Sequence, residues 1–433
     1  MNRLIYFSIF IIFLSNCSFS SNSEFWSKEK KIKEQSKNIK IYKLNQNREQ
    51  VTKEFNTNIK LNLKNKFSDN SFVNNLNNNN GMINYDGSLK KSSKYKFSKI
   101  KNFENLEPEL VFHDDGLIFF NSKGTILNFG NNSKLIWKKN IYTRKEKKLN
   151  PVLFFASDGK VLIVTDSIGK FYALNINYGE LLWKYNHSSP FNSQIKIYQD
   201  KFFTVDFENS LNCFSVKNGK MLWNINTEES FIKSIKKISL IIVNNLVIFN
   251  NSIGDISAVD INSRKLFWQT PTQSTNVYVD SFKLKISELD SESNSIYFSN
   301  NKNEFYSLDI ETGLLNWKQK VNSTIRPTVS DQLIFTVSLE GFLVIIDKNY
   351  GNIIRVTDVF DKLKKRKKVR PEGFILGKNS IYLTTSNGKL LLINTKNGKV
   401  IKILNIDNEK ISRPMVLNKS LYITKNNSII KLD

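Results

Sequence analysis

One segment of the chain recurs along most of its length, and this repetition limits the possible folds more than any other feature. Each copy reads as an alternating apolar strand, a short polar residue, a glycine turn and a second strand that carries tryptophan. Residues 173–183 (ALNINYGELLW) and 307–317 (SLDIETGLLNW) show the pattern. Alignment of the copies brings one residue per copy into register, which we call the marker: Trp137, Trp183, Trp223, Trp268, Trp317, Arg355 and Lys402.

Each copy also contains two turns with a physical signature. Glycine lies four residues before the marker in five copies, where a hairpin requires positive φ: Gly179, Gly219, Gly313, Gly351 and Gly398. Asn, Ser or Asp lies eight residues before the marker, where its side chain can bond the turn backbone. A period of about 45 residues with two hairpins indicates four strands per unit, which is typical of a β-propeller.

The ends of the chain set the expected number of blades. Six of the seven prolines fall at strand entrances, where the missing N–H costs no ladder bond. The last copy, Ile411 to Asp433, has only three strands, and the free edges of a closed ring must be paired. We expect Tyr95 to Phe103 to supply the fourth strand. The prediction is an all-β fold over residues 95–433, an eight-bladed β-propeller of four-stranded antiparallel blades closed by an N-terminal strand.

Residues 1–16 have the pattern of an export signal. Arg3 precedes an apolar run, Leu4 to Leu14, that is too short to span a bilayer. The run ends in Leu14-Ser15-Asn16-Cys17, which resembles the bacterial lipobox and implies lipidation of Cys17. An uncleaved anchor or a conventional signal peptide cut nearby are the alternatives. Ser18, in place of Asp, resembles the sorting signal for the outer membrane.

Residues 17–94 are predicted to be a polar, largely disordered tether. They are rich in Ser, Asn and Lys, with the run Asn77 to Asn80 near their C-terminal end. Such a composition buries too little apolar surface to offset the entropy of ordering. Phe55 to Leu63 is amphipathic and is able to dock onto another surface.

The residue inventory limits the chemistry. The chain has two cysteines, Cys17 and Cys213, and two histidines, His113 and His187, which are far apart in sequence. We predict no catalytic, cofactor-binding or metal-binding residue. The tryptophans are expected to pack between blades rather than to form a ligand platform, and Cys213 to be a small buried residue.

A net charge of +25 raises the question of anionic partners. Arginine precedes proline at the entrances of three successive blades, and its forked guanidinium suits carboxylates. A basic run just upstream of one entrance is expected on the same face. The predicted partner-binding residues are Arg326, Arg370, Arg413, Lys364, Lys365, Arg366, Lys367 and Lys368. The alternatives are local bonds to backbone carbonyls, internal salt bridges, or a solvated charge run that reflects basic composition everywhere.

The repeat pattern Ala-x-Asp-x-x-x-Gly-x-Leu-x-Trp resembles the pyrroloquinoline-quinone-type propeller repeat. This repeat occurs in quinoprotein dehydrogenases and in the cofactor-free BamB family of the outer-membrane β-barrel assembly machinery (BAM complex). Signal peptide, lipobox, eight blades and no further domain resemble the BamB family. Three features depart from it: the long tether, the basic charge, and Arg355 and Lys402 at the marker position.

The resemblance implies a non-enzymatic scaffold lipoprotein, lipid-anchored on the periplasmic face of the outer membrane. Such a protein takes part in protein insertion into the membrane by binding the central barrel subunit of the machinery, client proteins, or both. No cofactor and no small-molecule substrate are expected, and export disfavours nucleic acid. A quinoprotein dehydrogenase-like propeller is the first alternative, but it would carry an adjacent cysteine pair and a calcium site. A scaffold for another export or signalling system shares every feature and is the second.

Overall fold

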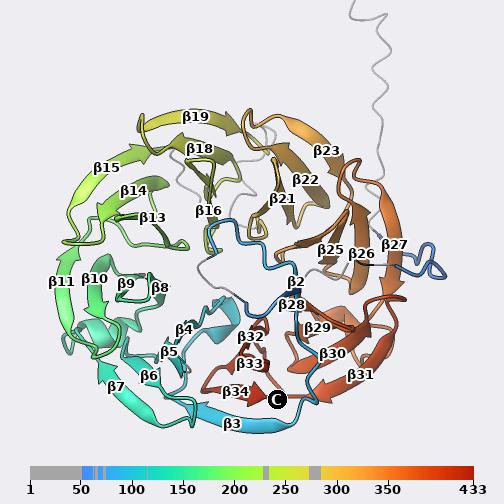
Figure 1. The fold of residues 1–433 in the computed structure, drawn as a ribbon, viewed down its shortest axis with the longest axis horizontal. Helices are drawn as coiled ribbons and strands as arrows, with labels where there is room; N and C mark the ends of the chain where they lie inside the picture. Colours follow the sequence, from blue (N-terminus) through green and yellow to red (C-terminus); the bar gives the residue numbers. More distant parts are fainter. Residues whose placement is uncertain are drawn as a thin grey trace, which may run out of the picture. The chain divides into compact units, whose positions relative to one another are not determined.

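Each repeat folds into one sheet, and the sheets stand around a common axis in the computed structural model (Figure 1). The structure describes residues 51–61, 63, 67–71, 75–114, 116–227, 234–272 and 284–433, which belong to one unit spanning residues 49–433. The described residues form eight sheets. Within these ranges no helix is long and apolar enough to cross a membrane.

Seven blades are contiguous in sequence, and their strands follow one another from the axis to the rim. Blade 1 comprises β4 (Val111–His113), β5 (Gly116–Phe120), β6 (Ile126–Phe129) and β7 (Leu135–Lys139). Blade 2 comprises β8 (Leu153–Ser157), β9 (Val161–Asp166), β10 (Lys170–Asn175) and β11 (Leu181–Asn186). Blade 3 comprises β12 (Lys196–Tyr198), β13 (Lys201–Val205), β14 (Ser210–Ser215) and β15 (Met221–Asn226). Blade 4 comprises β16 (Leu240–Val243), β17 (Leu246–Asn250), β18 (Ile256–Asp260) and β19 (Lys265–Thr270).

Blade 5 comprises β20 (Asp290–Glu292), β21 (Ser295–Asn300), β22 (Glu304–Asp309) and β23 (Leu315–Gln319). Blade 6 comprises β24 (Thr328–Ser330), β25 (Leu333–Val337), β26 (Phe342–Asp347) and β27 (Ile353–Asp358). Blade 7 comprises β28 (Pro371–Gly377), β29 (Ser380–Thr385), β30 (Lys389–Asn394) and β31 (Val400–Asn405). Among the described residues, short 3-10 turns lie in three connections: η1 (Phe103–Asn105), η2 (Glu146–Leu149) and η4 (Arg366–Lys368).

The eighth sheet joins the two ends of the described chain. It contains β32 (Met415–Leu417), β33 (Ser420–Lys425), β34 (Ser428–Leu432) and β3 (Lys91–Lys96), which pairs antiparallel with β34 (Figure 1). The strand therefore begins upstream of the predicted Tyr95 to Phe103 and shares only Tyr95 and Lys96 with it. The reason is that Phe97 and Ile100 already bond the turn at Asn426 and Asn427, beyond the end of β34.

The joints between blades explain the repeated residues. The marker tryptophans lie half-buried, and four of them donate from Nε1 to a backbone carbonyl of the next blade: Trp137 to Ile176, Trp183 to Val216, Trp268 to Ile310 and Trp317 to Lys348. Each ring also contacts the hairpin glycine of that blade, for example Trp137 against Gly179, so a side chain there would collide. This confirms the prediction that the tryptophans pack between blades.

Arg355 is the exception that keeps the same role. It is fully buried at the marker position of blade 6 and donates from NH1 to the carbonyl of Lys396, 2.5 Å away in blade 7. The same nitrogen donates to the carbonyl of Ile59 at 3.0 Å. Lys402, at the marker position of blade 7, is exposed.

Cys213 is buried as expected, and burial raises the pKa of its thiol to about 12.

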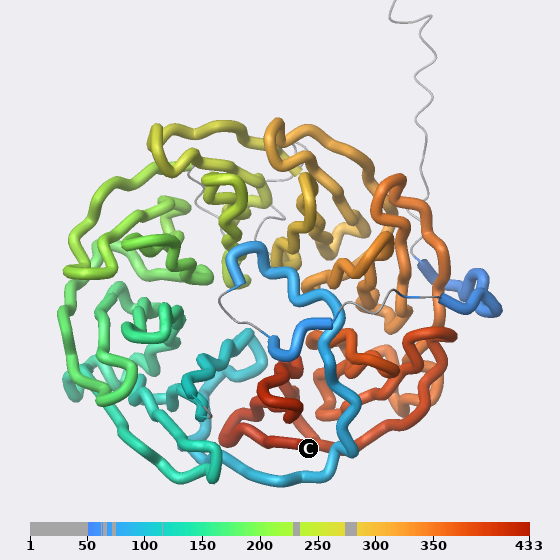
Figure 2. The backbone as a smooth tube through the Cα atoms, in the orientation of Figure 1, coloured from blue at the N-terminus to red at the C-terminus, as the bar shows by residue number. Residues whose placement is uncertain are grey.

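Residues 51–94, assigned to the tether from sequence, contact the propeller at several places in the part that the structure describes. Phe55 exchanges two hydrogen bonds with Val356 on the rim strand β27, which confirms that the Phe55 region docks. β1 (Phe67–Ser68) and β2 (Met82–Ile83) add two parallel strands to the inner edge of blade 7. In Figure 2 this N-terminal segment crosses the middle of the ring. The prediction of a disordered tether is therefore wrong for these residues, while residues 1–50, with the signal peptide and Cys17, lie outside the described ranges.

Candidate binding site at the channel mouth

The first strands of the blades all begin on one face, so the residues just before them converge around the axis. In five blades the residue two positions before the first strand is polar or charged: Glu109, Gln194, Glu288, Arg326 and Arg413. Four of these five line one pocket, and Gln194 Nε2 donates to Glu109 at 3.0 Å. The repeat geometry, rather than local sequence, thus brings these side chains together.

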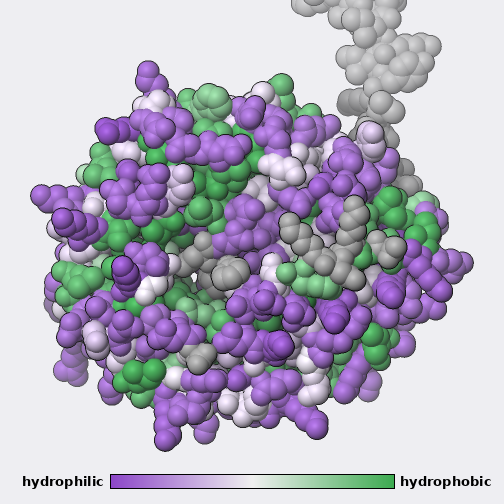
Figure 3. Space-filling view, in the orientation of Figure 1, coloured by the Kyte–Doolittle hydropathy of each residue, from purple (hydrophilic) through white to green (hydrophobic). Residues whose placement is uncertain are grey.

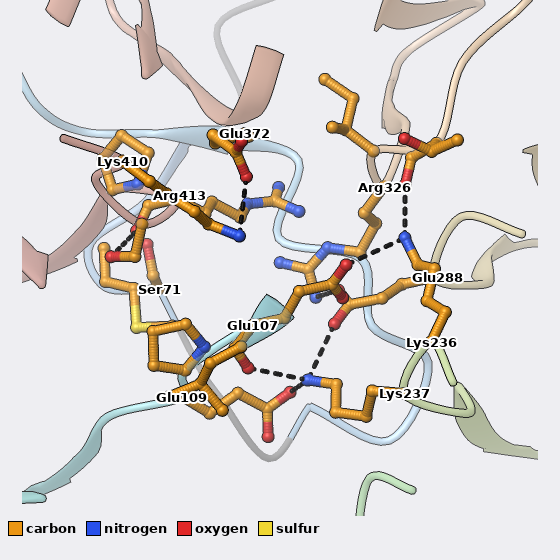
Figure 4. A pocket seen from close by; sticks show the side chains of 18 of the residues that line it. Ser71, Glu107, Glu109, Lys236, Lys237, Glu288, Arg326, Glu372, Lys410 and Arg413 are labelled. Carbon is orange, nitrogen blue, oxygen red and sulfur yellow. Dashed lines mark hydrogen bonds and ion pairs between the residues drawn. The ribbon is translucent and has the colours of Figure 1, made fainter. Parts of the chain in front are cut away.

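The pocket, which we call the channel pocket, contains about 770 Å³ of space unoccupied by protein atoms, part of which is open solvent. Its walls come from the entrances of blades 1, 4, 5, 6, 7 and 8, and the N-terminal segment adds Ser71 and Asn80. Figure 4 shows charged side chains of both signs pointing into it. The charged lining residues are Glu107, Glu109, Lys236, Lys237, Glu288, Arg326, Glu372, Lys410 and Arg413.

Most of these charges are paired. Lys237 Nζ lies 2.7 Å from Glu109 Oε1 and 3.2 Å from Glu288 Oε1. Burial alone would raise the pKa of Glu288, but the positive charges of Lys237 and Arg326 hold it far below its usual range. Lys236 pairs with Glu107 and Lys410 with Glu372, each at 3.0 Å. The carboxylates of this network are fixed in place by lysines from other blades.

Arg413 differs from its neighbours. Among the described residues its side chain has no ion pair or hydrogen bond, and its guanidinium lies 5.9 Å from the centre of the Phe374 ring. Burial, and after it the charge of Arg326, lower the pKa of Arg413 to about 9. Arg326 itself has one long contact, 3.5 Å to Glu288, and its buried Nε has no hydrogen-bond partner among the described residues.

The N-terminal segment fills the axis beside this pocket. Asn78 is buried, and its Nδ2 donates to Gln194 Oε1 at 3.1 Å and to the carbonyl of Leu289 at 2.9 Å. Lys196 Nζ donates to Asn78 Oδ1 at 2.6 Å. Because burial is the main influence, the pKa of Lys196 falls to about 7. The asparagine run is therefore held by blades 3, 4 and 5.

The structure brings together two of the three predicted arginines. Arg326 and Arg413 both line the channel pocket, whereas Arg370 is exposed and donates to the carbonyls of Val369 and Lys367. The expected equivalence fails because Ile375 holds in blade 7 the pairing position that Thr328 and Met415 hold in blades 6 and 8. Gly373, two residues before Ile375, therefore stands where blades 6 and 8 have arginine, and Arg370 lies three residues further upstream. Gly373 has φ +152°, and a side chain there would collide with Arg413.

The basic loop, residues 362–370, precedes β28 on the same face. Leu363 and Val369 are buried and anchor it, while Lys364, Lys365, Lys367 and Lys368 are exposed. Arg366 is instead used internally, with NH1 2.6 Å from Asp358 Oδ2. Figure 3 shows a face covered mostly by polar side chains, with apolar patches scattered over it.

Sequence reasoning missed the acidic and lysine residues of the pocket and the role of Asn78. The sequence does contain a signal for them, because Glu109 and Glu288 occupy the same register position as Arg326, although they differ from it in residue type. In the ranges that the structure describes, no group of three or more His, Cys, Asp and Glu residues could hold a metal ion.

The fold is shared with several solved structures. BamB from Moraxella catarrhalis is 16% identical, with a TM-score of 0.62, and the match covers 80% of this chain and 99% of that one. Quinohemoprotein alcohol dehydrogenase from Comamonas testosteroni is 9% identical, with a TM-score of 0.60, and the match covers 79% of this chain and 76% of that one. The C-terminal WD40 domain of Sif2 is 12% identical, with a TM-score of 0.57, and the match covers 82% of this chain and 99% of that one.

These identities are low, so the structural matches establish the propeller fold alone. No curated protein matched the chain in sequence. A family model described as outer membrane protein assembly factor BamB matches residues 122–357, more than half of the chain. With its pyrroloquinoline-quinone-type repeats and its ring of eight sheets, the chain belongs to the BamB family.

Proposed function

We propose that this protein is a non-catalytic scaffold lipoprotein of the outer-membrane β-barrel assembly machinery. It binds the central barrel subunit of that machinery, client proteins, or both, from the periplasmic face of the outer membrane. The observation that carries the proposal is membership of the BamB family, which the match over residues 122–357 establishes. The resemblance of residues 1–17 to a lipoprotein signal supports the membrane anchor.

The proposed docking surface is the basic loop, together with the mouth of the channel pocket. Four exposed lysines lie within five residues of one another, and the anchored loop holds them on the face where Arg326 and Arg413 lie. Such a concentration of positive charge attracts an acidic partner and speeds its association. Arg370 lies beside the loop and is exposed, so it remains in the proposed surface, while Arg366 acts within the loop.

The test reverses the loop charges and measures capture by the purified central barrel subunit. Changing Lys364, Lys365, Lys367 and Lys368 to Glu should leave folding intact, because exposed charges contribute little to stability. The association rate should fall, and its dependence on salt should weaken. Arg370→Ala should mainly raise the dissociation rate. A matched control reverses Lys138, Lys184, Lys217 and Lys220, which are equally exposed on blades 1, 2 and 3.

Equal association rates for the loop variant and the control variant would exclude the basic loop as the docking surface. Co-purification with a different envelope complex, and none with the barrel subunit, would favour a scaffold for another export or signalling system.

The lipid anchor is tested by Cys17→Ser. This variant should give a folded protein that no longer fractionates with the membrane and lacks the mass of the lipid. Unchanged mass and unchanged fractionation would contradict lipidation at Cys17.

The enzyme alternative has a direct test as well. The chain has no adjacent cysteine pair, and its likeness to a quinohemoprotein dehydrogenase is one of fold. A ligand that binds the native state raises the thermal midpoint of unfolding. Because we expect no quinone to bind, pyrroloquinoline quinone added with calcium should leave the midpoint unchanged. A saturable increase would support a quinoprotein instead.

We further propose that β3 closes the ring by covering the edge of β34. An unpaired edge strand is prone to pair with other chains, and the end of the repeat series would otherwise expose one. The fully buried Tyr95 supports this, because its ring packs against Phe129 of blade 1 and Tyr422 of blade 8 at centroid distances of 5.7 and 6.3 Å.

A further inference from the structure

The lining of the channel pocket has one more basic residue than acidic residues. Its lining contains five basic residues, Lys236, Lys237, Arg326, Lys410 and Arg413, and four acidic residues, Glu107, Glu109, Glu288 and Glu372. Each of the four carboxylates lies within 4 Å of a lysine, and Glu288 also contacts Arg326. The excess positive charge is therefore located at Arg413.

Arg413 is half-buried, and keeping its guanidinium there without a counter-charge is costly. An ionised group taken from water needs a counter-charge or hydrogen bonds, and five N–H donors of Arg413 lack a described acceptor. The nearby Arg326 Nε is a second buried donor without a partner. In Figure 4 the two guanidinium groups lie next to each other and face the middle of the pocket.

We propose that the channel pocket binds one oxyanion group, a carboxylate or a phosphate, between Arg413 and Arg326. The planar fork of arginine pairs with two oxygens of such a group at once. Lysines cannot compete for the anion, because Lys237, Lys236 and Lys410 already neutralise carboxylates. One free guanidinium suits one anionic group and not a polyanion, since the fixed glutamates would repel further negative charge.

The N-terminal segment completes this site. Ser71 and Asn80 line the pocket, and Ser71 is held against β32 by hydrogen bonds to Val416 through both its backbone N–H and its Oγ. Gly373 leaves the space that the Arg413 side chain occupies. The site therefore depends on the presence of glycine, rather than arginine, at that position of blade 7. It does not depend on the proposed function, because it concerns a small anion and not a protein partner.

The experiment titrates the purified protein with sodium phosphate and, separately, sodium acetate, at constant ionic strength set by sodium chloride. Either the phosphate arm or the acetate arm should give a saturable rise in thermal midpoint, and the arm that responds identifies the source of the oxyanion. Arg413→Gln should weaken that binding at least tenfold. Arg413→Lys keeps the charge and loses the forked guanidinium, so its affinity for the anion should lie between those of the unmodified protein and Arg413→Gln.

Arg370→Gln is the matched control, because Arg370 belongs to the same Arg-Pro series yet lies outside the pocket. It should bind the anion like the unmodified protein. If Arg413→Gln fails to fold, crystals of the unmodified protein soaked in selenate should show anomalous density in the channel pocket. The proposal is overturned if neither anion gives a saturable shift, if Arg413→Gln binds as tightly as the control, or if selenate density lies only elsewhere.

Discussion

The joints of blades 1 to 5 and those of blades 6 to 8 are built differently. In the first group a tryptophan marks each blade, and in four of the five its indole N–H bonds the next blade. In the second group the marker is Arg355 in blade 6, Lys402 in blade 7 and absent in blade 8. The N-terminal segment pairs with a strand of each of these blades: Phe55 with Val356, Met82 with Leu376, and β3 with β34.

The difference shows how a repeat protein accommodates a segment that is not part of the repeat. A tryptophan satisfies one carbonyl of the next blade and fills the joint with apolar surface, and its indole has no second donor. Arg355 has donors to spare, and it links blade 6, blade 7 and residue 59. In blade 6 the departure from the repeat therefore coincides with the place where residues 55–59 attach, whereas the asparagine run attaches to blades 3, 4 and 5 at the axis, away from the marker position.

The largest expected effect comes from the joint between blades 8 and 1. Tyr95→Ala removes a fully buried ring that contacts both blades and should cost about 3–5 kcal/mol of unfolding free energy. Denaturant unfolding measures this loss, with Tyr350→Ala, at an exposed hairpin, as the control. Equal stability of the two variants would show that β3 adds little to closure.

A smaller effect is expected where arginine replaces tryptophan. Arg355→Ala leaves the carbonyls of Lys396 and Ile59 without a donor in a buried joint and should cost about 1–3 kcal/mol. Arg355→Trp should recover part of this loss while releasing residue 59. Limited proteolysis should then cut between residues 51 and 63 faster than in the unmodified protein, and an unchanged cleavage rate would refute the link.

The smallest effect concerns the inner end of blade 5, beside the channel pocket. Asp290 is buried and its Oδ1 has no described partner, so burial raises its pKa well above the ordinary value. The folded state then holds a proton that the unfolded state has lost, and stability falls as pH rises above about 4. Asp290→Asn should raise the thermal midpoint at pH 7, and the gain should vanish below pH 4. A gain that is independent of pH would contradict this titration.

The sequence predicted the blades because each copy carries its own turn glycines, polar turn residues and marker. It wrongly predicted that Arg370 is equivalent to Arg326 and Arg413, because the Arg-Pro dipeptide is a local signal, whereas the position of Gly373 is set by the pairing of β28 with β29. It also assigned Asn77 to Asn80 to a disordered tether. Their composition is polar, and the partners that order Asn78 lie more than 100 residues away in sequence.

The path of the N-terminal segment has a mechanical consequence. Tension applied at residue 51 first meets the two hydrogen bonds between Phe55 and Val356, then the contact of Ile59 with Arg355. The pull next reaches β1, then the asparagines at the axis, then β2, and only last the six residues of β3. These hydrogen bonds are therefore loaded in series and break a few at a time. The N-terminal segment detaches from the rim and the axis before the strands of the ring carry any force.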